Sequence, residues 1–352
     1  MKCGKFSKLV AGLLLIVSAV QADLTADFHG IKGNVNDASK AFIKKVESVG
    51  FQAAGNDNIQ VHYFNRYKEK NLDLLSFYTV TNLEKIRPLL IKNPDFGAYA
   101  PFNMLFYKFL EEKEDTSWYG HLDPDLMLNI IGEKDEASRK AFKDMIAPFD
   151  ELAKKEMKPT ESKKLEFSNP LPATPLTKMV MKLPSNIEEM SDWVEEFVEK
   201  HDSAFVKSEF IIAGFLDFKF EYEDMEVDFD EYDAYWVSSL CHFKFSNSVF
   251  NHGEPQAGLF APCSVYFYVP KGSGELHVGY ANVSNWLATT GIKDEVMKKR
   301  ILAIDAEVVE TFKGLGFELE SQGSAAKKEA PVKKEAPAKE TEVKKVEEKK
   351  AS

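Results

Sequence analysis

Apolar residues in the first half of the chain follow two spacings, one typical of helices and one typical of strands. Residues 38–49 carry apolar side chains every three or four positions, up to Gly50, which predicts a helix. Further predicted helices are 84–91, 124–131 and 135–157, the last broken at Pro148. Runs rich in aromatic and branched residues predict strands at 60–67, 74–80, 99–109 and 117–122.

The second half repeats this order of elements. Ser185 and Glu188 have the spacing of a capping box ahead of an apolar stripe that predicts a helix through Val198. Predicted strands follow at 210–222, 233–241, 265–268 and 275–280, and a last helix is lined by Ile301, Ile304, Val308 and Phe312. Helix, strands, hairpin and helix in each half indicate an α+β fold with largely antiparallel sheets.

A short signature, Pro-x-x-Gly-x-x-Ala-Pro, occurs in both halves. Its main residues are Pro94, Gly97 and Pro101 in one copy and Pro255, Gly258 and Pro262 in the other. With a second block that aligns 118–136 with 277–295, 12 of 33 positions are identical, whereas chance gives roughly two. The pattern predicts two tandem copies of one module, at 26–157 and 180–318, joined by a linker at 158–179.

The two ends of the chain are not expected to belong to the modules. Residues 1–22 have a basic start, an apolar run and a small-residue cleavage site after Ala22, which predicts a signal peptide. The protein is therefore expected to be periplasmic or secreted, without stable membrane insertion after cleavage. Residues 324–352 repeat Lys, Glu, Ala and Pro without aromatic residues, which predicts a disordered tail.

Net charge narrows the choice of partners. Each end contributes +3 to a total of −11, so residues 23–323 carry −17. An acidic body argues against nucleic acid and anionic lipid as partners. Two copies of one module in a chain can pair with each other as two subunits of a dimer would. We therefore expect an internal pseudo-dimer of modules and a monomeric protein.

Both halves resemble an uncharacterised bacterial family, the domain of unknown function 302. The resemblance is carried by Asn93–Gly97, Ala100–Asn103 and Leu122–Pro124 in copy one, and by Pro255–Gly258, Ala261–Ser264 and Cys241 in copy two. It implies a compact domain with helices packed on one face of a curved antiparallel sheet, and no established activity. Copy one departs from the family at Val80 and Phe102, where the family tends to have two cysteines.

Cys241 and Cys263 are the cysteines that remain after the predicted cleavage. They lie at the end of one predicted strand and the start of another, so an exported chain has three options for them. They form a disulfide, they remain two buried apolar thiols, or they carry a redox or metal function. His242, His252 and His277 are candidate metal ligands beside them, but no Cys-x-x-Cys spacing is present, and adjacent residues of a strand face opposite ways.

Other polar patterns have structural explanations. Asp135-Glu136 and Asp294-Glu295 each open a predicted helix, where acids stabilise the helix dipole. The acidic run 221–233 lacks the glycine and terminal glutamate of a calcium loop and is expected to be a solvated hairpin tip. Aromatic residues crowd the predicted strands and are interpreted as core or as the lining of a ligand cavity.

No catalytic triad order, phosphate-binding loop or dinucleotide fingerprint is present in the sequence. We therefore expect a non-catalytic binding or accessory module of the cell envelope, with no cofactor indicated. The alternative is a redox-active or metal-binding protein that uses Cys241 and Cys263.

Overall fold

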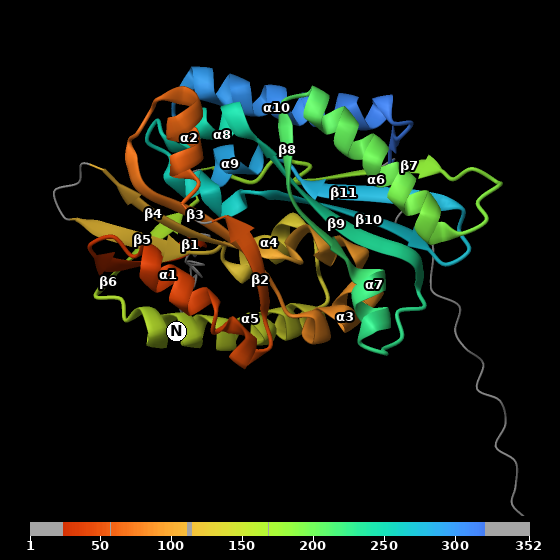
Figure 1. The fold of residues 1–352 in the computed structure, drawn as a ribbon, viewed down its shortest axis with the longest axis horizontal. Coiled ribbons are helices and arrows are strands. Elements are labelled where there is room, and N and C mark those ends of the chain that lie inside the picture. The colour runs from red at the N-terminus through yellow and green to blue at the C-terminus, as the bar shows by residue number, and fades with distance from the viewer. Residues whose placement is uncertain (1–23, 57, 111–114, 168, 321–352) are drawn as a thin grey trace, which may run out of the picture. The chain divides into compact units, whose positions relative to one another are not determined.

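Two six-stranded antiparallel sheets organise the computed structural model of the protein, which describes residues 24–56, 58–110, 115–167 and 169–320 (Figure 1). The predicted signal peptide and tail lie outside these residues. The α+β fold class is confirmed, and the sheets are open rather than closed into barrels. We call residues 24–166 the first module and residues 176–319 the second module.

The first sheet has the strand order β2-β3-β4-β5-β1-β6. Its strands are β1 Leu24–Lys32, β2 Gln52–Asn56, β3 Leu72–Thr81, β4 Phe102–Phe109, β5 Thr116–Gly120 and β6 Glu161–Glu166. The helices of this module are α1 Asn36–Ile43, η1 Val46–Val49, α2 Gln60–Tyr67, α3 Leu83–Lys92, η2 Pro94–Tyr99, α4 Pro124–Ile130 and α5 Glu136–Met157, of which η1 and η2 are 3₁₀ helices.

The second sheet has the order β8-β9-β10-β11-β7-β12, so that each strand has a counterpart in the first sheet. Its strands are β7 Leu176–Lys182, β8 Phe210–Asp217, β9 Tyr232–His242, β10 Cys263–Pro270, β11 Glu275–Ala281 and β12 Glu318–Leu319. The helices are α6 Met190–Lys207, α7 Phe218–Asp224, α8 Phe243–Phe250, η3 Pro255–Phe260, α9 Asn285–Thr289 and α10 Glu295–Gly314, with η3 a 3₁₀ helix. The two modules thus share one topology.

In each module, long helices cover one face of the sheet (Figure 1). Phe149 of α5 packs against Phe102 of β4 with their ring centroids 5.6 Å apart, and Phe42 of α1 joins the same cluster. In the second module, Phe197 of α6 and Phe312 of α10 contact Phe267 of β10. Side chains alternate between faces along a strand, so each sheet has a second apolar face that needs another partner.

Four local predictions were wrong. Residues 60–67 form the helix α2, and 218–222 belong to α7, where strands were expected. Pro148 does not break α5, because the buried side chains of Met145, Phe149 and Leu152 hold the helix across it. Helix α6 begins at Met190 rather than at the predicted capping box, and no side chain caps it.

The expected linker 158–179 contains strand structure. Residues 161–166 form β6 and pair with β1 at the edge of the first sheet, and β7 begins at Leu176. The charged sequence of β6 conceals its strand character, since lysines and glutamates are common on edge strands that face water.

The signature segments pack on the second apolar face of each sheet, the face that the long helices leave uncovered. Asn103 Nδ2 donates a hydrogen bond to the Pro262 carbonyl at 3.0 Å, and Ser264 Oγ donates one to the Pro101 carbonyl at 3.2 Å. Asn103 and Ser264 are equivalent positions of the repeat, as are the two prolines. Reciprocal contacts of this kind are the mark of a twofold interface. The modules therefore meet as a pseudo-symmetric pair.

Two further contacts between the modules repeat in the same reciprocal way. The Tyr63 hydroxyl on α2 lies 2.7 Å from Ser246 Oγ on α8, and the Tyr222 hydroxyl on α7 donates to the Leu83 carbonyl at 2.9 Å. Tyr63 also packs on the ring of Phe243 at 4.6 Å. These contacts bury Tyr63 against the second module and so stabilise α2 in its place.

The signature glycines lie where the modules come closest. A Cβ atom on Gly97 would lie 2.5 Å from Tyr266 Cβ and would overlap the hydroxyl of Tyr235. A Cβ atom on Gly258 would lie 2.6 Å from the ring of Phe77 and 3.0 Å from Leu105. In both cases the obstructing residues belong to the other module. The glycine of the signature is therefore a requirement of module pairing.

Replacing either signature glycine by alanine tests this requirement. Gly97→Ala and Gly258→Ala should each lower the free energy of unfolding by about 1–3 kcal/mol, because the added methyl group overpacks the interface. Urea denaturation of the mature chain measures the change. Gly314→Ala is the matched control, since nothing lies within 4 Å of its Cβ position, and it should leave stability unchanged or slightly raised. Equal stability of the unsubstituted protein and all three variants would contradict the assignment of the signature glycines to the module interface.

Candidate functional site

Cys241 and Cys263 lie near each other as free thiols. Cys263 pairs with Leu240 in the β9–β10 register, so Cys241 is one position out of register with it, and neighbouring positions of a strand face opposite sides of the sheet. Both residues line one apolar cavity of about 30 Å³ beneath α10 in the second module. The register corrects one sequence equivalence: Phe102 pairs with Val80, so the counterpart of Cys241 is Thr81, whereas Val80 corresponds to Leu240.

The surroundings of the two thiols oppose ionisation. Burial raises the pKa of Cys241 to about 11 and that of Cys263 to about 12. Thiols with such pKa values are almost fully protonated at neutral pH. The thiolate is the nucleophile and the metal ligand, so this environment suits neither redox exchange nor metal binding.

The three candidate histidines are held by separate partners. His242 caps α8, where its Nδ1 accepts a hydrogen bond from the Phe245 amide at 3.3 Å. His252 pairs with Glu69 of the first module at 3.3 Å, and the ring of His277 stacks on Tyr268 at 4.8 Å. Within the described ranges, no group of three or more His, Cys, Asp or Glu side chains has the geometry of a metal site. The structure does not gather the candidate ligands.

The apolar cavity exists because of one difference between the modules. In the first module the ring of Phe102 packs between His121 and Phe149 at centroid distances of 5.3 and 5.6 Å. Cys263 occupies the equivalent position in the second module and is much smaller. Trp286, Ile304 and Val308 line the space that remains.

The first module has a polar pocket between its sheet and α5. It has a volume of about 120 Å³. Its polar lining comes from β1, β5, the segment after β5, and α5, and consists of Asp27, His29, Tyr119, His121, Asp123, Asp150 and Lys154. We call this space the polar pocket. At two equivalent positions the second module has Met179 and Val278 in place of His29 and Tyr119, so the polar lining belongs to the first module alone.

A hydrogen-bonded pair forms one wall of the polar pocket. His121 Nε2 lies 2.7 Å from Asp150 Oδ1, and His121 Nδ1 lies 2.6 Å from the Leu122 carbonyl oxygen. Burial alone would lower the pKa of His121, but the Asp150 carboxylate outweighs it and raises that pKa. Burial likewise opposes the charge of Asp150, yet His121 holds the pKa of Asp150 below its ordinary value. Both shifts favour the charged pair, an imidazolium and a carboxylate.

This geometry limits the chemistry that His121 can perform. A carbonyl oxygen only accepts, so Nδ1 must carry a proton, and the carboxylate accepts the proton on Nε2. An imidazolium with both N–H groups engaged has no lone pair with which to act as a general base. His29 is different, since burial lowers its pKa and keeps its imidazole neutral at pH 7.

Sequence reasoning missed His29, His121 and Asp150. His29 and Tyr119 are directly opposite each other in the β1–β5 register, with ring centroids 5.3 Å apart, although 90 positions separate them in the chain. No short motif marks such an encounter. The available signal was a polar residue on a strand of otherwise buried residues.

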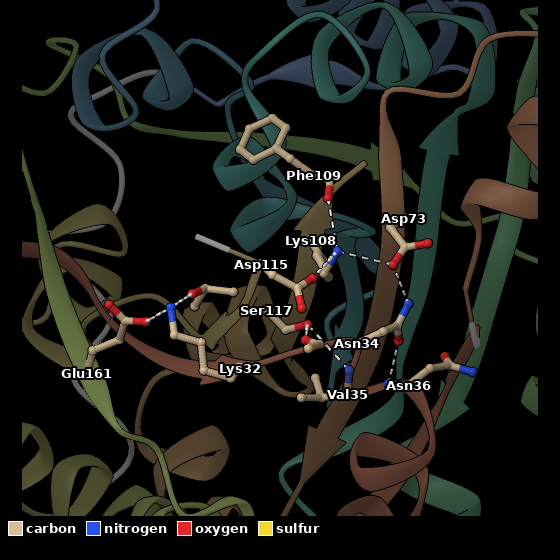
Figure 2. A network of polar contacts seen from close by, with 12 residues as sticks. Lys32, Asn34, Val35, Asn36, Asp73, Lys108, Phe109, Asp115, Ser117 and Glu161 are labelled. Carbon is tan, nitrogen blue, oxygen red and sulfur yellow. Dashed lines mark hydrogen bonds and ion pairs between the residues drawn. The ribbon is translucent and has the colours of Figure 1, made fainter. Parts of the chain in front are cut away.

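A second polar cluster, around Lys108, is structural (Figure 2). The side chain of Lys108 is 8% exposed, and its Nζ lies 3.0 Å from Asp115, 3.3 Å from Asp73 and 3.4 Å from the Phe109 carbonyl. These three acceptors match its three N–H donors. Asn34 donates to Asp73 and accepts from the Asn36 amide, which fastens the start of α1 to the sheet.

The paired acids cap helices as expected, whereas the acidic run is not the hairpin tip that was expected. Asp135 and Asp294 cap α5 and α10, accepting hydrogen bonds from the amides of Ala137 and Met297. The acidic run spans the end of α7 and the turn before β9. A different acid, Asp95 of η2, is buried at the module interface, where it accepts from the Tyr266 hydroxyl at 2.7 Å and from Lys178 at 3.0 Å.

Part of the chain is similar to known proteins. Residues 188–315 match the family described as domain of unknown function DUF302. This match lies within the second module. Among solved structures, an uncharacterised conserved DUF302 protein from Bacillus stearothermophilus is similar at 14% identity and a TM-score of 0.31, over 40% of this chain and 98% of that one. No curated protein matches the chain.

The His121–Asp150 pair predicts a pH dependence of stability. The raised pKa of His121 means that its contribution is complete below about pH 6.5 and lost as the pH rises through the folded-state value. The lowered pKa of Asp150 means that its contribution is complete above about pH 3.9 and lost below it. The pair should therefore stabilise the fold most between about pH 4 and pH 6.5.

Asp150→Asn removes this pair. It should lower the free energy of unfolding by about 1–2 kcal/mol at pH 5.5, less than a fully buried pair would, because the side chain of Asp150 is 39% exposed. At pH 9 the loss should be smaller. Urea denaturation at both pH values measures it, with Asp144→Asn on the exposed side of α5 as a control of small effect. A loss that is the same at both pH values would contradict the charged pair.

Proposed function

We propose that the protein is a non-catalytic binding module of the cell envelope, in which two DUF302-like modules pair within one chain. The observation that carries this proposal is the contrast between the interface and the cavities. The interface contacts repeat in both modules, whereas the spaces between sheet and long helix differ, one polar and one apolar. A shared scaffold with two different cavities suits recognition.

The chemistry of the cavity walls supports binding over catalysis. His121 has both ring nitrogens engaged, and the two cysteines are protonated at neutral pH. An activated nucleophile needs a base beside it or a lowered pKa, and neither accompanies these groups. The residues that line the cavities can still donate and accept hydrogen bonds and present an apolar surface.

The proposed location and assembly rest on the sequence and on the pairing. The first 22 residues have the features of a signal peptide, so we propose export to the periplasm or beyond. Among the described residues, none of the helices has the length and apolar composition that crossing a bilayer requires. Since each module already covers the second apolar face of the other module's sheet, the mature protein should be a monomer.

Native mass spectrometry of the mature protein, purified without denaturation, tests the proposed function. The expected spectrum contains a monomer together with a species heavier by the mass of a small molecule, which is lost on mild activation. A stable dimer without any bound molecule would count against both parts of the proposal. Cell fractionation of the full-length chain, followed by immunoblotting, tests export independently.

The rival function, redox or metal handling by Cys241 and Cys263, draws on one observation, which is that both thiols line the same cavity. A thiol reagent applied to the mature protein in denaturant, without prior reduction, should find two free thiols per chain. In the folded protein the same reaction should be slow, because burial raises both pKa values. Finding no thiol before reduction and two afterwards, or one bound metal per chain, would favour the rival.

A further inference from the structure

The polar pocket is large enough for a small guest. Its volume of about 120 Å³ is close to that of an engineered apolar cavity, about 150 Å³, that admits benzene. A molecule of about four to six non-hydrogen atoms therefore fits. The pocket opens beside Asp27 and Lys154, which are exposed, and its inner end is formed by Tyr119, which is 1% exposed.

The hydroxyl of Tyr119 is the feature that points to a guest. It is buried, and it has no hydrogen-bond partner in the part of the chain that the structure describes. The ring is held in place, stacked on Phe106 at 5.7 Å and facing the imidazole of His29 at 5.3 Å. An unsatisfied buried hydroxyl destabilises the fold, so a molecule that hydrogen-bonds to it offsets that cost.

The charges around the pocket favour a cation. Three carboxylates line it, those of Asp27, Asp123 and Asp150, against two positive groups. The positive charge of His121 is already paired with Asp150 at 2.7 Å. Asp27 and Asp123 then face Lys154, which leaves the mouth of the pocket with a net negative charge. Asp123 keeps one oxygen for capping α4, where it accepts from the Asp125 amide at 2.9 Å.

We infer that the polar pocket of the first module binds a small amino alcohol, with the hydroxyl bound to Tyr119 and the ammonium group facing Asp27 and Asp123. This inference rests on the proposed binding function and names the chemical class of one ligand. The second module has no equivalent site, because Met179 and Val278 replace His29 and Tyr119. Its apolar cavity is left to a different guest or to none.

Three probes of nearly equal size separate charge from shape. Ethanolamine, ethylene glycol and glycolate differ chiefly in bearing a positive charge, no charge and a negative charge. Each is titrated into the full mature protein while the ring signals of His29 and Tyr119 are followed by NMR. The expected result is saturable binding, with ethanolamine tightest, ethylene glycol weaker and glycolate weakest.

Two variants locate the binding. Tyr119→Phe keeps the stacked ring and should weaken ethanolamine binding about fivefold, the value of one hydrogen bond. Asp27→Asn should weaken ethanolamine but leave ethylene glycol unchanged. The matched controls are Tyr99→Phe, which removes another buried hydroxyl without a partner at a different cavity, and Asp144→Asn on α5. Neither control should change the affinity for ethanolamine.

Three outcomes would overturn the inference. The first is the absence of saturable shifts at His29 and Tyr119, which would indicate a pocket filled by water alone. The second is binding of glycolate as tight as that of ethanolamine. The third is an equal effect of Tyr119→Phe and Tyr99→Phe on the affinity for ethanolamine. If a variant is unstable, its melting temperature shows it, and the three-probe order in the unmodified protein still decides. A ligand retained in native mass spectra despite such outcomes would leave the proposed function standing.

Discussion

The close approach of each signature glycine to the sheet of the other module is the constraint on which this structure depends. Gly97 lies against Tyr235 and Tyr266, and Gly258 lies against Phe77 and Leu105. A six-stranded sheet with helices on one face leaves its second face exposed. Each module covers this face of the other module. The prolines and glycines of the signature let the 3₁₀ segments enter this space without side chains in the way. Short reciprocal hydrogen bonds from Asn103 and Ser264 then fix the register of the two modules.

Pairing within one chain releases the two modules from being identical. At the interface, Asp95 of η2 accepts hydrogen bonds from Tyr266 and Lys178, whereas the apolar side chains of Phe77 and Leu105 meet Gly258. Between sheet and long helix, the divergence is larger. Phe102 fills the first module and Cys263 opens the second, while His29 and Tyr119 make the first pocket polar. Under the proposed function, the repeated contacts supply stability and the cavities that differ between the modules supply recognition.

Much of the fold could be predicted from the sequence, and the failures have physical causes. The hairpin strands, α5 and α10 follow from periodicity and from the capping residues Asp135 and Asp294, because these signals are local. Helix α2 could not be predicted, since Tyr63 is held by Ser246 and Phe243, about 180 positions away. The candidate site was harder still. His29, Tyr119, His121 and Asp150 come from three separate stretches and meet only through strand register and the packing of α5 on the sheet, whereas the cysteines attracted notice by their rarity.

Nuclear Overhauser effects measured on the mature protein test whether the two signature glycines lie against the opposite modules. With ¹³C-labelled glycine and protonated aromatic rings in a deuterated background, we expect cross-peaks from the Gly97 α-protons to the ring of Tyr266, and from those of Gly258 to the ring of Phe77. Both sets must appear, because the pairing is reciprocal. Cross-peaks from each glycine to rings of its own module alone would contradict the pairing of the two modules through their shared signature.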